Sequence, residues 1–351
     1  MQPLNKPADD DLDFSSLPPG PFATVAEMHM SRTPSPAREG DAERRAQGLY
    51  AAAVRAYETA PAGTCTFVCI SDTHCKRTCH HLASTTFGSR LGRAECPTRT
   101  VSADGELTLP PGDVLLHAGD FCTRGTLAEL ESFAAWWHSQ TAFCQRLLVP
   151  GNHDCALDAQ YERETTEEKE ELASSERLHG CDVHHHALSL LHRPDIGSFL
   201  LFDSGVTTTV AGFTVWGSPW QPAFWGAFNL PRGPQLAAKW AAIPGDTHVV
   251  VTHTPPGQGD YVPRSRARPH VGCEALAREL LHRVQPAVSV FGHVHEAAGV
   301  SVARCGSGRT TVFVNAASCD THYDAVNPPI VFQLRRSAEG EAVVRVVGTD
   351  E

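Results

Sequence analysis

The stretch VFGHVHEAAG, Val290 to Gly299, joins a short apolar run to the sequence Gly-His-Val-His. A buried strand has little use for two imidazoles at its end. In an extended chain, residues i and i+2 project to the same face, so His293 and His295 are able to converge on one point. This is ligand geometry, although one His-x-His pair is weak evidence unless the chain supplies further ligands.

An apolar run that ends in polar residues occurs four more times. The runs TFVCI, DVLLHA, LLVP and HVVV are followed by SDTH, GDF, GNHD and THTPP. Helical patterns lie between several of them, which favours an α/β fold. Because functional groups in open α/β sheets lie beyond the carboxyl ends of the strands, we expect all five polar clusters to carry the chemistry.

The side chains at these five strand ends are oxygen and imidazole donors, without a thiolate. They are Asp72, His74, Asp120, Asn152, His153, His253, His293 and His295. Such donors suit Mn, Fe or Zn better than a cysteine-type zinc site or an all-oxygen calcium site. The set is too large for one ion. Two ions about 3.5 to 4 Å apart that share a carboxylate form the usual clamp for displacement at phosphorus, with a hydroxide held between them as nucleophile.

The ordered motifs D-x-H, G-D, G-N-H-D, H and G-H-x-H resemble those of the calcineurin-like metallophosphoesterase superfamily. Between Thr64 and Leu334, stretches such as GSPWQP, AFNLPRG, HVGCEAL and NPPIVF also look like its metallophosphoesterase domain-containing subgroup, which is linked to cyclic nucleotide phosphodiesterase activity. The resemblance implies an α/β fold, a four-layer αββα sandwich of two mixed sheets flanked by helices.

The superfamily pattern also implies a role for each donor, with two divalent ions of which Mn is favoured. Asp72, His74 and His295 would hold the first ion, Asn152, His253 and His293 the second, and Asp120 would bridge both. His153 would donate to the phosphate and protonate the leaving oxygen, and Asp154 would orient it. Some subgroup members lack the first His of G-H-x-H and are expected to be poorer hydrolases, so His293 favours real turnover.

The implied function is metal-dependent hydrolysis of a phosphodiester, with a cyclic nucleotide or a related small phosphate ester as substrate. Two alternatives stay open. A phosphomonoesterase or phosphoprotein phosphatase would use the same centre, and a non-catalytic scaffold would bind nucleotide or protein partners and keep the metals for stability. The complete set of donors argues against the scaffold.

Three further residues are candidates for substrate contact. Arg124 follows the GDF motif closely and is able to reach a phosphate, although a solvated loop arginine fits equally well. Trp220 and Phe224 lie in WGSPWQPAFWGAFN, where proline and glycine indicate a loop. Aromatic rings in a loop are able to stack on a nucleobase, whereas aromatic rings in general belong to the core.

The composition limits the partners. The chain has 351 residues, 41% hydrophobic and 20% charged, which supports one sizeable core, and its net charge is −11. An excess of acidic side chains argues against a nucleic-acid duplex or an anionic membrane as partner. The amino terminus lacks a basic start followed by an apolar segment, so we expect no signal peptide and a cytoplasmic protein with reduced cysteines.

The organisation along the chain follows from composition shifts. We expect a disordered arm at 1–40, a docking helix and linker at 41–62, the metallophosphoesterase domain at 63–336 and a C-terminal tail at 337–351. The polar segment 75–112 is longer than is usual in the subgroup, and it would shape the entrance because it leaves a metal-bearing loop. The histidine run at 184–186 is expected in an exposed loop.

Overall fold

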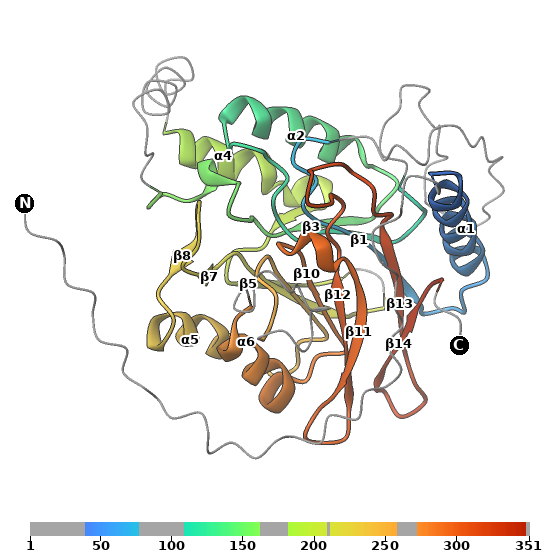
Figure 1. The fold of residues 1–351 in the computed structure, drawn as a ribbon. Coiled ribbons are helices and arrows are strands. Elements are labelled where there is room, and N and C mark those ends of the chain that lie inside the picture. The colour runs from blue at the N-terminus through green and yellow to red at the C-terminus, as the bar shows by residue number, and fades with distance from the viewer. Residues whose placement is uncertain (1–38, 77–108, 162–181, 209–210, 258–271, 349–351) are drawn as a thin grey trace, which may run out of the picture.

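Two six-stranded mixed sheets pack face to face and carry helices on their outer faces (Figure 1). The computed structural model describes residues 39–76, 109–161, 182–208, 211–257 and 272–348. This arrangement confirms the expected four-layer α/β sandwich. The expected arm at 1–40 and the expected entrance segment at 75–112 lie mostly outside the described residues.

The first sheet has the order β14-β13-β1-β2-β3-β4. Its strands are β1 (Cys65–Ile70), β2 (Val114–His117), β3 (Gln145–Leu148), β4 (Ser198–Leu200), β13 (Ile330–Arg336) and β14 (Ala342–Val346). Strands β1 to β4 are parallel, and β13 and β14 add antiparallel neighbours at one edge.

The second sheet has the order β11-β12-β10-β9-β6-β5. Its strands are β5 (Ser204–Thr207), β6 (Thr214–Ser218), β9 (Val249–Thr252), β10 (Val288–Phe291), β11 (Gly299–Arg304) and β12 (Thr310–Asn315). The four central strands are parallel, and β5 and β11 are antiparallel edges. A separate two-stranded pair consists of β7 (Gln221–Pro222) and β8 (Asn229–Leu230).

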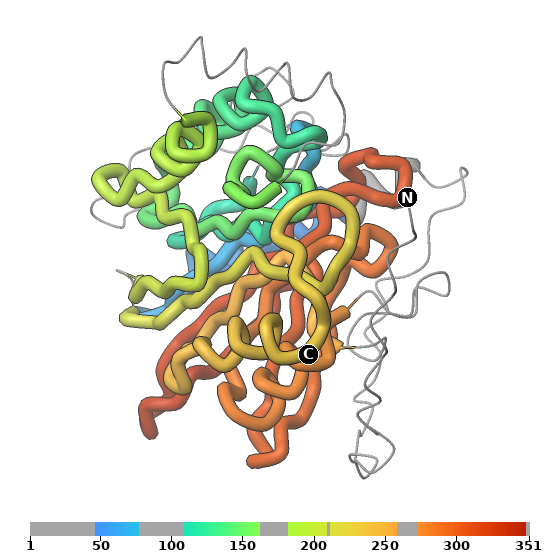
Figure 2. Tube along the Cα trace, turned by 90° about the vertical axis from the view of Figure 1, so that its left-hand side faces the viewer, coloured from blue at the N-terminus to red at the C-terminus, as the bar shows by residue number. Residues whose placement is uncertain are grey.

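Helices cover both outer faces. The longer ones are α1 (Glu39–Glu58), α2 (Leu127–Ser139), α4 (Val183–Leu191), α5 (Pro234–Ala241) and α6 (Glu274–Arg278), which continues as a π-helical turn, η5 (Glu279–Val284). Short 3-10 turns are η3 (Cys155–Leu157), η4 (Pro194–Ile196) and η6 (His295–Ala297). Helices α2 and α4 lie on the side of the first sheet, and α5 and α6 on the opposite side (Figures 1 and 2). No helix within the described ranges is long and apolar enough to cross a membrane.

Strand β1 shows how the sequence builds two apolar layers. Phe67 and Cys69 face the other sheet, and the ring of Phe332, on the neighbouring strand β13 of the same sheet, stacks on Phe67 at 4.8 Å. Val68 and Ile70 point the other way, into the core beneath the helices. Because successive side chains of a strand alternate between faces and both faces are covered, the strand reads as a continuous apolar run. Strand β1 therefore contributes to both apolar cores, one between the two sheets and one beneath the helices.

Two local expectations differ from the structure. The stretch 337–351 is not a simple tail, because Ala342–Val346 forms β14 and pairs with β13 across a turn in which Gly340 has a φ of +85°. The side chains of β14 alternate between half-buried and exposed. This edge strand therefore has only a weak hydrophobic pattern in the sequence. The histidine run 184–186 lies in α4 and not in a loop, because Asp182 caps that helix by accepting from the backbone N–H of His185.

Candidate metal centre

Strands from both sheets direct the expected donors to one region. Strands β1, β2 and β3 lead into the loops of Asp72, Asp120 and Asn152, and β9 and β10 lead into His253 and His293. These strands are parallel within each sheet, so their carboxyl ends lie at the same edge. The donors therefore gather where the ends of the two sheets meet.

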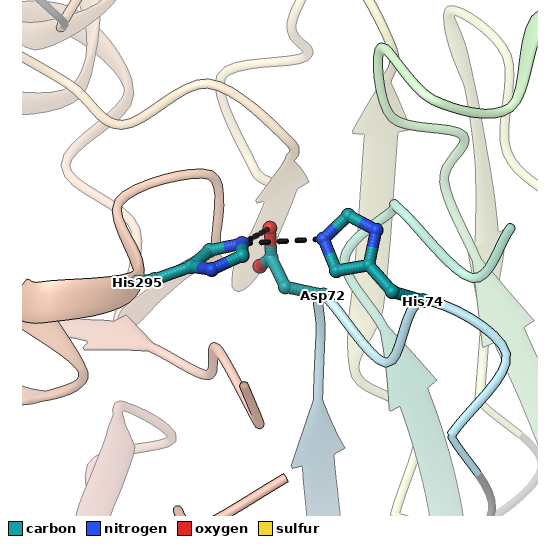
Figure 3. A group of neighbouring side chains, drawn as sticks. All are labelled: Asp72, His74 and His295. Carbon is teal, nitrogen blue, oxygen red and sulfur yellow. Dashed lines mark hydrogen bonds and ion pairs between the residues drawn. The ribbon is translucent and has the colours of Figure 1, made fainter. Parts of the chain in front are cut away.

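The first cluster comprises Asp72, His74 and His295, whose ligand atoms all lie within 4.8 Å of one another. The Nε2 atom of His295 lies 3.3 Å from Asp72 Oδ1 and 3.2 Å from His74 Nε2 (Figure 3). The other ring nitrogens face backbone carbonyls, at 2.8 Å from Asp320 O and 3.2 Å from Cys122 O. A neutral ring that donates from Nδ1 presents an unprotonated Nε2, which is the form that ligates a metal.

The second cluster comprises Asp120, His253 and His293, again within 4.8 Å. The amide oxygen of Asn152 joins it, at 3.1 Å from His253 Nε2 and 3.0 Å from His293 Nδ1. The carbonyl of Ala118 lies 2.8 Å from His253 Nδ1 and fixes that ring. This cluster thus contains three of the donors that the sequence assigned to a second ion, together with the carboxylate assigned to both.

Asp120 lies between the two clusters. Its Oδ2 atom is 3.3 Å from His253 Nε2 on one side and 3.9 Å from His74 Nε2 on the other. Its Oδ1 atom accepts the backbone N–H of His153 at 2.8 Å. The side chain is almost completely buried, so both oxygens are directed by protein contacts.

The carboxylates of the centre are ionised in spite of their burial. Burial alone would raise the pKa of Asp72 and of Asp120, but neighbouring histidines bring both below the usual range. Conversely, burial alone would lower the pKa of His253 and His295, but the adjacent carboxylates raise both to about 9. Burial lowers the pKa of His293 to about 3. The two buried, ionised carboxylates therefore favour positive charge in the centre. Bound divalent cations would supply that charge.

The loops that carry the donors have strained backbones. Asp72, His74, Asp120 and His293 have φ values of 50°, 42°, 57° and 69°. Left-handed conformations of residues other than glycine cost of the order of 1 to 3 kcal/mol each and gather at functional sites. At Gly292 a β-carbon would collide with the carboxylate of Asp72, which explains why glycine precedes the first histidine of G-H-x-H.

Comparison with known proteins agrees with this geometry. The sequence profile of the calcineurin-like phosphoesterase family matches residues 65–297. The chain belongs to the calcineurin-like phosphoesterase family. Metallophosphoesterase domain-containing protein 1 of Homo sapiens is 36% identical over 276 residues, which cover 78% of this chain and 72% of the human protein; the Mus musculus protein gives the same values. A solved 5′-nucleotidase precursor from Thermus thermophilus has a TM-score of 0.42 and 15% identity, covering 81% of this chain and 54% of that one. Family membership makes the protein a metal-dependent phosphoric ester hydrolase.

His153 lies at the edge of the two donor clusters. Its Nδ1 atom is 2.6 Å from the carbonyl of Thr123, and its Nε2 atom is 4.0 Å from Asp120 Oδ2. A carbonyl only accepts, so Nδ1 donates and Nε2 faces the centre. Arg124, the next residue after Thr123, has an exposed side chain, and its backbone N–H donates to Glu129 at 2.9 Å. No described contact joins the Arg124 guanidinium to the centre.

Asp154 has a different role from the one that the sequence suggested. Its carboxylate does not orient His153, whose ring is fixed by a backbone carbonyl. It accepts three backbone N–H groups instead, from Asp120 at 2.9 Å, Cys122 at 2.9 Å and Gly151 at 2.7 Å. In this tight turn neighbouring side chains diverge, and Asp154 points back to tie the G-D loop to the G-N-H-D loop.

Replacing Asp154 with Ala should therefore destabilise the protein. Three buried N–H groups would lose their acceptor, and each unsatisfied group costs about 1 to 3 kcal/mol, so the free energy of unfolding should fall by about 3 kcal/mol or more. Urea unfolding measures the change. Asp195→Ala is the matched control, because Asp195 pairs with Arg193 on the surface, and exposed pairs contribute little to stability. Equal losses in the two variants would contradict the assigned role.

The structure separates the two aromatic candidates. Trp220 is buried, its Nε1 donates to Asp203 Oδ2 at 3.0 Å, and Lys239 Nζ lies 4.3 Å from its ring centre. Its ring belongs to the core and has no described contact with the centre, which fits the core alternative that the sequence left open. The ring of Phe224 is exposed and lies 4.9 Å from that of His293.

Two aromatic residues beside the centre were missed from sequence. The ring of Trp225 lies 4.8 Å from that of His153, and the ring of Tyr323 lies 4.7 Å from that of His74. Trp225 is in the same loop as Phe224, so its position was within reach of the loop argument. Tyr323 follows no motif, and only the fold brings it to the centre.

Proposed function

We propose that this protein is a dinuclear metal-dependent phosphodiesterase that hydrolyses a cyclic nucleotide or a related small phosphodiester. The position of Asp120 carries the dinuclear part of the proposal. Its Oδ2 atom lies 3.3 Å from one donor cluster and 3.9 Å from the other. A carboxylate shared between two sets of donors is the arrangement that holds two ions about 3.5 to 4 Å apart.

The ligand sets follow from the two clusters. The first ion would be held by Asp72, His74 and His295, the second by Asn152, His253 and His293, and both by Asp120. Oxygen and imidazole donors without thiolate suit Mn, Fe or Zn, and of these three we favour Mn. Two such ions, when bound, supply the Lewis acidity that activates water and neutralises phosphoryl oxygens.

His153 would supply the proton that leaves with the product. The bond from Nδ1 to Thr123 holds the ring so that Nε2 faces the centre, where His74, Asp120 and His153 have ligand atoms within 4.8 Å of one another. In this proposal His153 belongs to neither ligand set. When the ring is protonated, Nε2–H donates toward a leaving oxygen, and the partly exposed side chain regains its proton from solvent. Arg124 remains a candidate for contact with a phosphoryl oxygen because it lies on the same loop as Thr123.

Metal add-back tests this function. Metal-stripped protein should regain hydrolysis of bis(p-nitrophenyl) phosphate and of 2′,3′-cyclic AMP on addition of Mn²⁺, with two ions bound per chain by elemental analysis. The monoester p-nitrophenyl phosphate should react much more slowly. Faster turnover of the monoester would favour a phosphomonoesterase. Two bound ions without turnover of any ester would favour the binding scaffold.

A further inference from the structure

Exposed aromatic side chains surround the centre. Six large apolar side chains of the described residues are strongly exposed: Ile196, Phe224, Trp225, Val302, Tyr323 and Val343. The three aromatic ones all border the metal centre, and we call Phe224, Trp225 and Tyr323 the aromatic rim. Their exposed fractions are 45%, 48% and 42%. Clustered apolar exposure of this kind marks a binding surface, whereas scattered exposure needs no explanation.

Each ring of the rim contacts a histidine of the centre. The ring centres lie 4.9 Å apart for Phe224 and His293, 4.8 Å for Trp225 and His153, and 4.7 Å for Tyr323 and His74. The contacts are edge-on or tilted, at 83°, 57° and 69°. Because one side of each ring rests on a histidine while much of its surface stays exposed, a group attached to phosphorus at the centre lies within reach of the rim.

The loop that carries Phe224 and Trp225 is held firmly. Asn229 Oδ1 accepts from the N–H of Phe224 at 2.9 Å, and its Nδ2 donates to the carbonyls of Phe224 and Gly226 at 2.8 and 2.7 Å. Ala227 N–H donates to the carbonyl of Asn152 at 2.9 Å. At Gly226 a β-carbon would collide with that same carbonyl. The two rings are therefore fixed relative to a donor of the second cluster.

Tyr323 is fixed relative to the first cluster. The side chain of Asp320 accepts from the N–H groups of His322 and Asp324, at 2.8 and 3.1 Å. The carbonyl of Asp320 accepts from Tyr323 N–H at 3.0 Å and faces His295 Nδ1 at 2.8 Å. Tyr323 has a φ of 63°, a conformation rare for an aromatic residue, which persists only where its surroundings determine it. One short turn thus orients both a metal donor and a rim ring.

We propose that the aromatic rim is the specificity subsite for an aromatic group, a nucleobase or an aryl ring, attached to the phosphodiester. This inference rests on the proposed function and adds which residues select the substrate. Rigid, exposed rings offer flat apolar surface for stacking. Because their positions are already fixed, they lose little conformational entropy when the substrate binds. The rim gives an alkyl group no comparable partner, so we expect aryl diesters to be preferred over alkyl diesters.

Two substrates with one leaving group test the rim. Phenyl p-nitrophenyl phosphate and methyl p-nitrophenyl phosphate both release p-nitrophenolate and differ only in the retained group. The experiment compares their kcat/KM values on Mn²⁺-loaded wild type, Trp225→Ala and Tyr323→Ala. Because each variant loses one stacking ring, the phenyl-to-methyl ratio should fall about tenfold in each variant, mainly through KM of the phenyl ester. Ile196→Ala, an exposed residue far from the centre in sequence, should leave the ratio unchanged.

Conservative variants separate stacking from structural damage. Trp225→Phe and Tyr323→Phe keep a ring and should retain most of the ratio, whereas Trp225→Leu and Tyr323→Leu keep apolar bulk without a ring and should lose it. Unchanged ratios in the alanine and leucine variants, with both esters hydrolysed, would overturn the inference and leave the phosphodiesterase intact. If loaded wild type hydrolyses neither ester, the proposed function itself fails.

Discussion

Replacing Asp120 with Asn should reduce kcat/KM for phosphodiesters by about 10² to 10³·⁵-fold. The side chain is almost completely buried between the two donor clusters. Breaking a buried charged arrangement by removing one partner costs about 3 to 5 kcal/mol, which corresponds to about 10² to 10³·⁵ in rate or affinity. We expect Asp120→Asn to bind fewer than two ions per chain, as measured by elemental analysis beside the hydrolysis assay.

The backbone conformation at Asp120 accepts asparagine without added strain, so the substitution tests the charge of the side chain. Asp120 has a φ of 57°, and asparagine adopts this left-handed region about as readily as aspartate. Asp203→Asn is a matched control, because Asp203 also has a left-handed backbone, with a φ of 52°, and accepts from Ser218 and Trp220 outside the centre. The control should keep both ions and its activity. Full metal content and turnover in Asp120→Asn would show that the two clusters do not share this carboxylate.

Much of the centre could be predicted from short-range sequence patterns. The two-residue spacing in D-x-H and G-H-x-H predicts converging side chains, and the apolar run before each motif predicts a buried strand. In the structure these strands end at the same edge, so the donors Asp72 and His74 meet His295 from a distant part of the chain. That meeting required the resemblance to a family, because strand order and the packing of two sheets leave no local signal.

The errors share a physical cause, since side-chain direction depends on the backbone within one turn. Asp154 follows His153 directly, yet its carboxylate points to three backbone N–H groups on the opposite side. Trp220 and Trp225 lie in one aromatic loop, yet only Trp225 faces the centre, because Gly226 and its neighbours bend the chain against Asn152. Composition marks such loops, but it does not give the direction of each ring.

Tyr323 shows a limit of another kind. The turn around it depends on hydrogen bonds to Asp320, which are typical of an aspartate turn and leave a local signal. Its position beside His74 depends on the fold, which brings residues 74 and 323 together. Asp320 is a local signal for the turn, but no local pattern indicates which residue the turn will contact. For this reason the sequence predicted which candidate donors come together, while the rim was only partly anticipated.

Replacing His153 with Gln should abolish proton donation and leave the metals in place. In the proposed mechanism this side chain donates a proton to the leaving oxygen and belongs to neither ligand set. General acid catalysis contributes about 10² to 10⁴-fold, so kcat/KM for 2′,3′-cyclic AMP should fall by a factor in this range. The leaving group of this substrate is a ribose oxygen, which departs poorly as an anion. Steady-state kinetics and elemental analysis of the same preparation measure both quantities.

The leaving group decides whether His153 acts as an acid. p-Nitrophenolate is stable as an anion and needs no proton, so His153→Gln should lose far less activity toward bis(p-nitrophenyl) phosphate than toward the cyclic nucleotide. His185→Gln, at an exposed position of α4, should behave as wild type toward both. Equal losses on the two substrates would mean that the ring stabilises the phosphoryl group without transferring a proton. Loss of an ion from the variant would make His153 a ligand, because its Nε2 lies 4.0 Å from Asp120 Oδ2 and needs only a small displacement to enter the shared site.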